Sequence, residues 1–255
     1  MTCDPYNVAE SPWAPNPVVW SYGGGRQSVA LAVLVEQGKL PRPELAVFAD
    51  TGREDSATMV YHREHVASFL DLEIAPHELA TVDLWSSGGS LLIPAFTSTG
   101  KLPTYCSVEW KRRVVSRFLR AKGYGPARPI DLWLGISLDE IERARDSDVA
   151  WIRHRFPLLD LRLTRHDCER IIADAGMPPA PKSSCWMCPF RSREQWRDLR
   201  DNRPADWDKA VALDAAIRER DPNVFVHRDR LPLADAVAAG PETPEESCQT
   251  EFCWT

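Results

Sequence analysis

From Ser21 to Ser28 the chain reads Ser-Tyr-Gly-Gly-Gly-Arg-Gln-Ser, a glycine-rich stretch between two apolar segments. The segment before it, 18–20, is short and apolar and predicts a buried strand. The segment after it, 28–37, contains no Gly or Pro and ends at Gly38, which predicts a helix with a glycine C-cap. A strand, a glycine turn and a helix N-terminus form an anion cradle. Glycines let backbone N–H groups approach a phosphate, and the helix dipole adds partial positive charge.

The glycine stretch is neither a Walker A loop, because no Gly-Lys-Ser/Thr closes it, nor the Gly-x-Gly-x-x-Gly of dinucleotide folds. It resembles the PP-loop, Ser-Gly-Gly-x-Asp-Ser, of the adenine-nucleotide α-hydrolase-like superfamily. Tyr22 stands at the first glycine position and Gln27 at the aspartate position. The other interpretation is a strand-to-helix turn without a ligand. The resemblance implies that an adenine nucleotide is bound by Ser21, Gly23, Gly24, Gly25, Gln27 and Ser28.

Composition describes an ordinary globular chain. The 255 residues are 44% hydrophobic and 27% charged, with a net charge of −6, which argues against a strongly basic nucleic-acid-binding protein. No apolar run approaches the roughly 20 residues of a membrane span, and the N-terminus lacks a signal-peptide pattern. We therefore expect a cytoplasmic protein. In that compartment its seven cysteines favour metal or redox chemistry over disulfides.

A second buried strand is predicted over 45–49, and it ends at Asp50-Thr51-Gly52. Ligands in open α/β sheets bind beyond the carboxyl ends of the strands, so these three residues should lie beside the glycine stretch. PAPS reductases, which belong to the same superfamily, carry a similar Asp-Thr-Gly where the nucleoside binds. The segment 156–161, Phe-Pro-Leu-Leu-Asp-Leu, resembles their Pro-Leu-Leu-Asp-Trp. A helix over 164–175, with Thr164 as its N-cap, is predicted to follow.

The cysteines suggest a second site. Cys106 opens a predicted helix whose first turns carry Lys111, and a thiolate is favoured at a helix N-terminus beside cations. Cys185-Trp-Met-Cys188 puts two thiols on one tight turn, as metals and iron–sulfur clusters require.

Cys106 and Cys185 are 79 positions apart, which resembles the spacing in iron–sulfur adenylyl-sulfate reductases. The resemblance implies that Cys106, Cys185 and Cys188 bind a 4Fe–4S cluster. Cys168 is the first candidate for a fourth ligand, and an open iron position is the other option. A zinc site, a redox dithiol and ordinary thiols stay open as alternatives.

Three basic residues are the candidates for catalysis. The strand predicted over 131–136 is followed by Ser-Leu-Asp-Glu-Ile-Glu-Arg-Ala-Arg, which resembles a family segment whose basic residues reach substrate phosphates. This implies such a role for Arg143 and Arg145, with Lys111 as the third candidate. A helix with Glu–Arg pairs is the alternative interpretation of the segment.

The predicted fold class is α/β, a doubly wound, mostly parallel sheet of the adenine-nucleotide α-hydrolase-like type. We expect an irregular arm over 1–17, a PP-loop nucleotide-binding domain over 18–180, and a helical, cysteine-bearing appendage with a tail over 181–255. The appendage should hold helices over 192–203 and 205–220, followed by a short strand at 223–227.

The resemblance implies an enzyme that acts at the α-phosphate of an adenine nucleotide. In the first interpretation, ATP with Mg²⁺ adenylates an oxygen of tRNA or DNA, and sulfur is inserted with the help of the cluster and of a sulfur-donor or reductant protein. In the second, adenylyl sulfate or PAPS is reduced to sulfite, with Cys248 or Cys253 of the tail as nucleophile. The third interpretation is a non-catalytic module that senses a nucleotide or a cluster.

Overall fold

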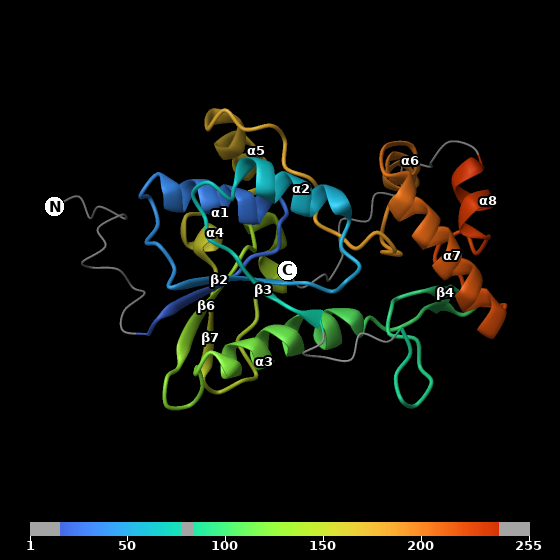
Figure 1. Ribbon diagram of the computed structural model, residues 1–255, viewed down its shortest axis with the longest axis horizontal. Helices are drawn as coiled ribbons and strands as arrows, with labels where there is room; N and C mark the ends of the chain where they lie inside the picture. The colour runs from blue at the N-terminus through green and yellow to red at the C-terminus, as the bar shows by residue number, and fades with distance from the viewer. Residues whose placement is uncertain (1–15, 78–83, 240–255) are drawn as a thin grey trace.

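A computed structural model describes residues 16–77 and 84–239 and is built around a parallel sheet (Figure 1). Its five strands lie in the order β3-β2-β1-β6-β7, and each neighbouring pair is parallel. Strands β2 and β6 are buried along their whole length because helices cover both faces. The predicted α/β fold class is confirmed. The strand bounds are Val18–Ser21 (β1), Leu45–Ala49 (β2), Glu73–Ala75 (β3), Ile130–Leu134 (β6) and Ile152–Arg155 (β7).

One face of the sheet carries α1 (Arg26–Glu36), α2 (Ser56–His65), α4 (Pro157–Asp160) and α5 (Arg165–Asp174), and the other carries α3 (Arg113–Ala121) (Figure 1). On the first face, a core that includes Trp20, Leu31 and Ile172 fills the space between β1, α1 and α5. On the second face, α3 packs against a separate core that includes Val19 and Leu119. Two layers of helices around one sheet are what a doubly wound fold requires.

Local sequence explains where the helices begin and end. Gly38 has φ +71°, as a glycine that terminates a helix should, and it closes α1 as predicted. Thr164 caps α5, since its side chain accepts from the backbone N–H of Asp167 while the Asp167 carboxylate accepts from the N–H of Thr164. The predicted N-cap is therefore confirmed.

The order of the strands positions a binding crevice. From β1 the chain builds outward through β2 to β3, and it then returns to the opposite side of β1 to form β6 and β7. The carboxyl ends of β1 and β6 are where the direction of winding reverses, and open α/β sheets bind ligands at that point. The glycine stretch leaves β1 there.

Beside the sheet lies a helical appendage with its own core (Figure 1). It contains α6 (Arg193–Asn202), α7 (Pro204–Arg220), α8 (Leu233–Ala238) and the hairpin of β4 (Phe96–Thr97) and β5 (Gly100–Lys101). The core also takes in residues 91–95 and Trp110, which precede position 180 in the chain. The division at 180 stays a prediction, and these earlier residues pack with the appendage.

Three local expectations differ from the structure. Strand β7 was not predicted, because its sequence Ile-Arg-His-Arg lacks apolar alternation; buried Asp131 offsets its charge by accepting from Arg153 at 2.6 and 2.8 Å. Residues 223–227 form only a single bridge, between Phe225 and Phe96. The helix after Cys106 begins with a π-helical turn, Ser107–Arg112 (η3), a form that is frequent at functional sites.

Candidate functional site

The glycine loop has the geometry of an open anion cradle. Gly24 has φ +70°, and a Cβ at this position would lie 2.4 Å from Cγ2 of Thr58, so only glycine fits. The backbone N–H of Gly23 donates to Oγ of Ser28 at 3.0 Å, which ties the loop to the first turn of α1. Gly25 is the N-cap of α1 without a side-chain cap, and the first turn holds no acidic residue. The positive end of the helix is therefore open to an anion.

The structure explains why glutamine replaces the motif's aspartate. The side-chain amide of Gln27 donates to Glu140 at 2.9 Å, and Glu140 is about nine-tenths buried. An aspartate at position 27 would place a second carboxylate against Glu140. The other oxygen of Glu140 accepts from Arg143 at 2.6 Å and from Arg165 at 2.8 Å. Glu140 thus holds Arg143 near the start of α1, together with Arg165, which the sequence had not indicated.

Arg145 is placed differently from Arg143. Its side chain is exposed and donates to the carbonyl of Ala144 at 2.9 Å. Its own carbonyl accepts from Nδ1 of His154 at 2.8 Å. Because a carbonyl only accepts, Nδ1 carries the proton and Nε2 of the neutral ring is an acceptor.

A first pocket opens on the α3 side of the sheet, next to the glycine loop. Its apolar floor includes Leu132 and Ile152, and its polar rim includes Ser21, Lys111 and His154. Burial lowers the pKa of His154, so the ring is neutral near pH 7, while hydrogen bonding to the carbonyl of Arg145 acts in the opposite direction. His154 was missed because it lies on β7, whose sequence did not predict a strand. An apolar floor with a few polar groups is typical of small-molecule sites.

Asp50-Thr51-Gly52 turns away from β2 toward the cysteines. The carboxylate of Asp50 accepts from the N–H of Gly52 at 2.7 Å, which closes a tight turn. The hydroxyl of fully buried Thr51 donates to Glu54 at 2.9 Å and lies 3.7 Å from Sγ of Cys185. This loop therefore connects the carboxyl end of β2 with the Cys-x-x-Cys turn.

A second pocket gathers the three predicted cluster cysteines. Cys106, Cys185 and Cys188 all line it, although the first lies beside η3 and the others on a distant turn. Its walls include Trp110 and Phe190, and the three cysteines are half-buried. Their role as ligands stays a prediction.

The thiol of Cys185 is strongly perturbed. Its pKa is raised to about 12, chiefly by burial and also by the Glu54 carboxylate, while Lys111 acts in the opposite direction. In the absence of a metal the group is therefore a neutral thiol at pH 7. A thiol of this kind becomes a thiolate when a metal coordinates it.

The three cysteines of this pocket are a donor set of the kind that iron–sulfur clusters take. Within 16–77 and 84–239, no three His, Cys, Asp or Glu side chains are placed to hold one metal ion. A zinc ion needs its sulfur ligands about 2.3 Å away. A 4Fe–4S cluster is wider, and its cysteines are spread around it. Three cysteines around one pocket suit the thiolate chemistry of iron–sulfur clusters.

Cys168 is not brought to this pocket. It lies on α5, fully buried in the core between α1 and the sheet. Burial raises its pKa to about 12 there. We therefore leave Cys168 out of the ligand set proposed below. Cys248 and Cys253 of the tail lie outside the described residues.

The two pockets share a lining residue and are joined by hydrogen bonds. Lys111 lines both of them. Backbone hydrogen bonds join the Asp-Thr-Gly loop to the cysteine turn: Asp55 N–H donates to the carbonyl of Ser184 at 3.0 Å, and Trp186 N–H donates to that of Arg53 at 2.9 Å.

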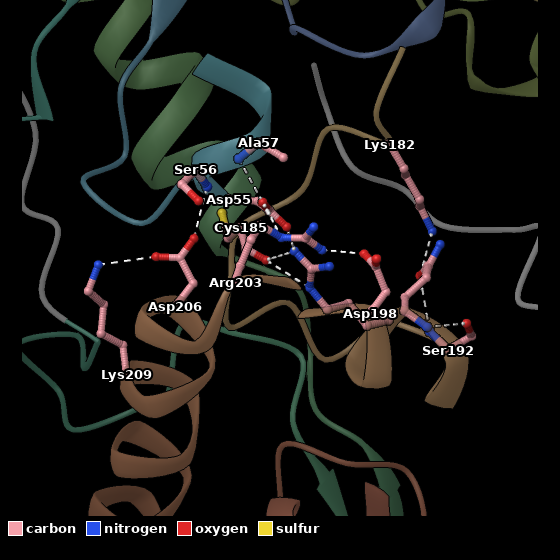
Figure 2. Close-up of polar contacts among 12 residues, drawn as sticks. Asp55, Ser56, Ala57, Lys182, Cys185, Ser192, Asp198, Arg203, Asp206 and Lys209 are labelled. Carbon is pink, nitrogen blue, oxygen red and sulfur yellow. Dashed lines mark hydrogen bonds and ion pairs between the residues drawn. The ribbon is translucent and has the colours of Figure 1, made fainter. Parts of the chain in front are cut away.

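Figure 2 shows the charged groups that secure this junction, with Asp55 next to Arg203 and Cys185. The Asp55 carboxylate accepts from Nη2 of Arg191 at 2.6 Å, and the same nitrogen lies 3.1 Å from the carbonyl of Cys185. Nearby, Asp206 of α7 accepts from the backbone N–H of Ser56 at 2.9 Å. The appendage is thus held against the start of α2.

Comparisons with known proteins add little to this picture. No protein-family model matches the chain, and no curated protein matches its sequence. Among solved structures, a phosphoadenylyl-sulfate (PAPS) reductase from Candida auris in complex with phosphate is similar. It is 13% identical, the match covers 69% of this chain and 78% of that one, and the TM-score is 0.46. We draw no functional argument from a likeness of this degree. In the described part of the chain, no helix has the length and apolar character that a bilayer span needs.

Proposed function

We propose that this protein is a PP-loop enzyme that binds an adenine nucleotide in the first pocket and acts at its α-phosphate. The observation that carries the proposal is the shared position of Lys111, which lines both the pocket beside the glycine loop and the pocket of the three cysteines. A cation at this position stabilises negative charge that develops on a phosphate during cleavage. It also lies next to the thiols.

In the proposed reaction, ATP adenylates an oxygen of a nucleic-acid acceptor, tRNA or DNA, and pyrophosphate leaves. Sulfur at the oxidation level of sulfide then displaces the activated oxygen, which leaves with AMP. The glycine loop and α1 hold the pyrophosphate portion, with Mg²⁺ on the nucleotide, and Arg143 contributes positive charge beside them. Cys106, Cys185 and Cys188 would hold a 4Fe–4S cluster. When bound, that cluster supplies a site for the inorganic sulfur, which a donor protein delivers.

The test is product formation by anaerobically purified protein. With ATP and a pool of tRNA or DNA, we expect pyrophosphate release that depends on the nucleic acid. Sulfite released from adenylyl sulfate or PAPS would overturn the proposal in favour of a reductase, and a Cys248→Ala/Cys253→Ala variant would then show whether the tail supplies its nucleophile. Nucleotide binding without any product would indicate a sensing module.

A matched pair of variants tests the role of Lys111. Lys111→Met removes the cation shared by both pockets, and it should lower pyrophosphate release by two orders of magnitude or more, about the loss seen for a single transition-state donor. Arg113→Met is the control, because Arg113 is an exposed cation that pairs with Glu109. Equal activity in the two variants would contradict the assigned role.

A further inference from the structure

The hydroxyl of Ser183 is a buried polar group that has no hydrogen-bond partner in the described structure. Leaving a buried hydroxyl unpaired costs free energy, and such groups in native proteins call for an explanation, of which a bound ligand is one. The residue immediately precedes the segment that contains Cys185, and it lines the cysteine pocket.

Ser183 also lies against the glycine loop. A Cβ at Gly25 would have three nearest neighbours, and all are atoms of Ser183: its Cβ at 3.2 Å, its N at 3.4 Å and its Cα at 3.9 Å. Gly25 is the N-cap of α1, where the uncapped end of the helix dipole attracts an anion. The backbone and Cβ of Ser183 therefore lie against the N-cap of α1, where the cradle begins.

We propose that Ser183 is a further anion-binding residue, whose hydroxyl donates to a phosphate or pyrophosphate oxygen held by the glycine loop. This inference rests on the proposed nucleotide-binding function and extends it, because it adds a phosphate contact from the cysteine-bearing part of the chain. The segment 183–185 would then contact the nucleotide through Ser183 and contribute a thiol to the second pocket through Cys185.

The surroundings hold Ser183 in place for this role. The carbonyl of the next residue, Ser184, accepts from the N–H of Asp55, and Arg191 binds both Asp55 and the carbonyl of Cys185. Asp55 is 4% exposed and Arg191 is 5% exposed. A hydroxyl held in advance costs little entropy when it binds, so its hydrogen bond counts nearly in full.

The test compares Ser183→Ala with Ser184→Ala, since the two serines are adjacent, line the same pocket, and only Ser183 is found among the nearest neighbours of Gly25. The probes are inorganic pyrophosphate and ATP, with dissociation constants measured by calorimetry. A hydrogen bond to a charged group corresponds to about a 10- to 150-fold change in affinity. We expect a loss of that size in Ser183→Ala and less than about threefold in Ser184→Ala.

A second readout separates binding from folding. Because the Ser183 hydroxyl is unpaired without a ligand, its removal should leave the thermal midpoint of the ligand-free protein unchanged or raise it, while reducing the increase caused by pyrophosphate. Unchanged affinity in a folded Ser183→Ala variant would overturn the inference, as would an equal loss in both variants. Wild-type protein that binds neither probe would instead refute the proposed function itself.

Discussion

Replacing Asp55 by asparagine removes one negative charge from between two arginines at the junction of the sheet and the appendage. Asn keeps the shape of the side chain, and its amide oxygen still accepts from the N–H of Ala57, which Asp55 caps at 3.0 Å. The substitution therefore leaves the start of α2 intact. What it removes is the charge that Arg191 and Arg203 face.

The magnitude follows from burial. The side chains of Asp55 and Arg191 are only 5% and 6% exposed, and their atoms are 2.6 Å apart. Removing one partner of a buried ion pair costs about 3–5 kcal/mol, because a buried charge is left uncompensated. Arg203 lies 3.0 Å from Asp55 but is 18% exposed and also pairs with Asp198, so part of its charge stays compensated. We therefore expect a loss near the lower limit, about 3 kcal/mol.

The assay is urea unfolding at pH 7.5, and Asp198→Asn is the matched control. Asp198 pairs with the same Arg203, but its side chain is 51% exposed, so its loss should cost about 0–1 kcal/mol. A loss of about 3 kcal/mol is a large fraction of the 5–15 kcal/mol that stabilises a typical domain. If Asp55→Asn stays within about 1 kcal/mol of wild type, or matches Asp198→Asn, the junction does not depend on the buried pair.

Three other predictions concern the metal, the glycine loop and pH. Protein purified without oxygen should contain iron and labile sulfide, and Ser at any of the three pocket cysteines should lower the iron content, while Cys168→Ala should not. Zinc without iron would contradict this. Gly24→Ala should cost at least about 1–2 kcal/mol in urea unfolding because of its positive φ, and Thr58→Ser, which deletes the clashing methyl, should recover part of the loss. If the losses of stability in Gly24→Ala and Thr58→Ser simply add in the double variant, the proposed clash between positions 24 and 58 is wrong. Burial lowers the pKa of His62, so the unfolded chain takes up a proton near pH 6.5 before the folded one does. The free energy of unfolding should therefore fall as pH drops below about 6.5 toward the folded pKa, and His62→Gln should remove that part of the decrease.

Gly24 is a poor probe of anion binding, although it lies in the glycine loop. In the structure, a Cβ at Gly24 points at Thr58 on α2 rather than into an open cradle. Substitution therefore strains the fold itself, and Ser183 is the more direct probe of anion binding.

The local pattern predicted the βα units well. Strand 45–49 and the cap at Thr164 follow from apolar runs and capping chemistry within a few residues. β7 was missed because Asp131, on the neighbouring strand, accepts from Arg153 and Arg155. That compensation comes from a strand 20 or so positions away, and no pattern within β7 reveals it.

The sequence by itself determined the order of strands, glycine turn and helices, and it indicated which residue types carry chemistry. These features depend on backbone preferences and on periodicity over short windows. Only the tertiary structure decided which of those residues meet. Cys106 joins Cys185 and Cys188 in one pocket because Trp110 and residues 91–95 pack with the appendage, whereas Cys168 is buried in the core that α1 and α5 share with the sheet. Lys111 belongs to the π-helical turn, whose residues line both pockets. Contacts of this kind depend on packing between segments that are far apart in the chain, and local sequence does not encode that packing.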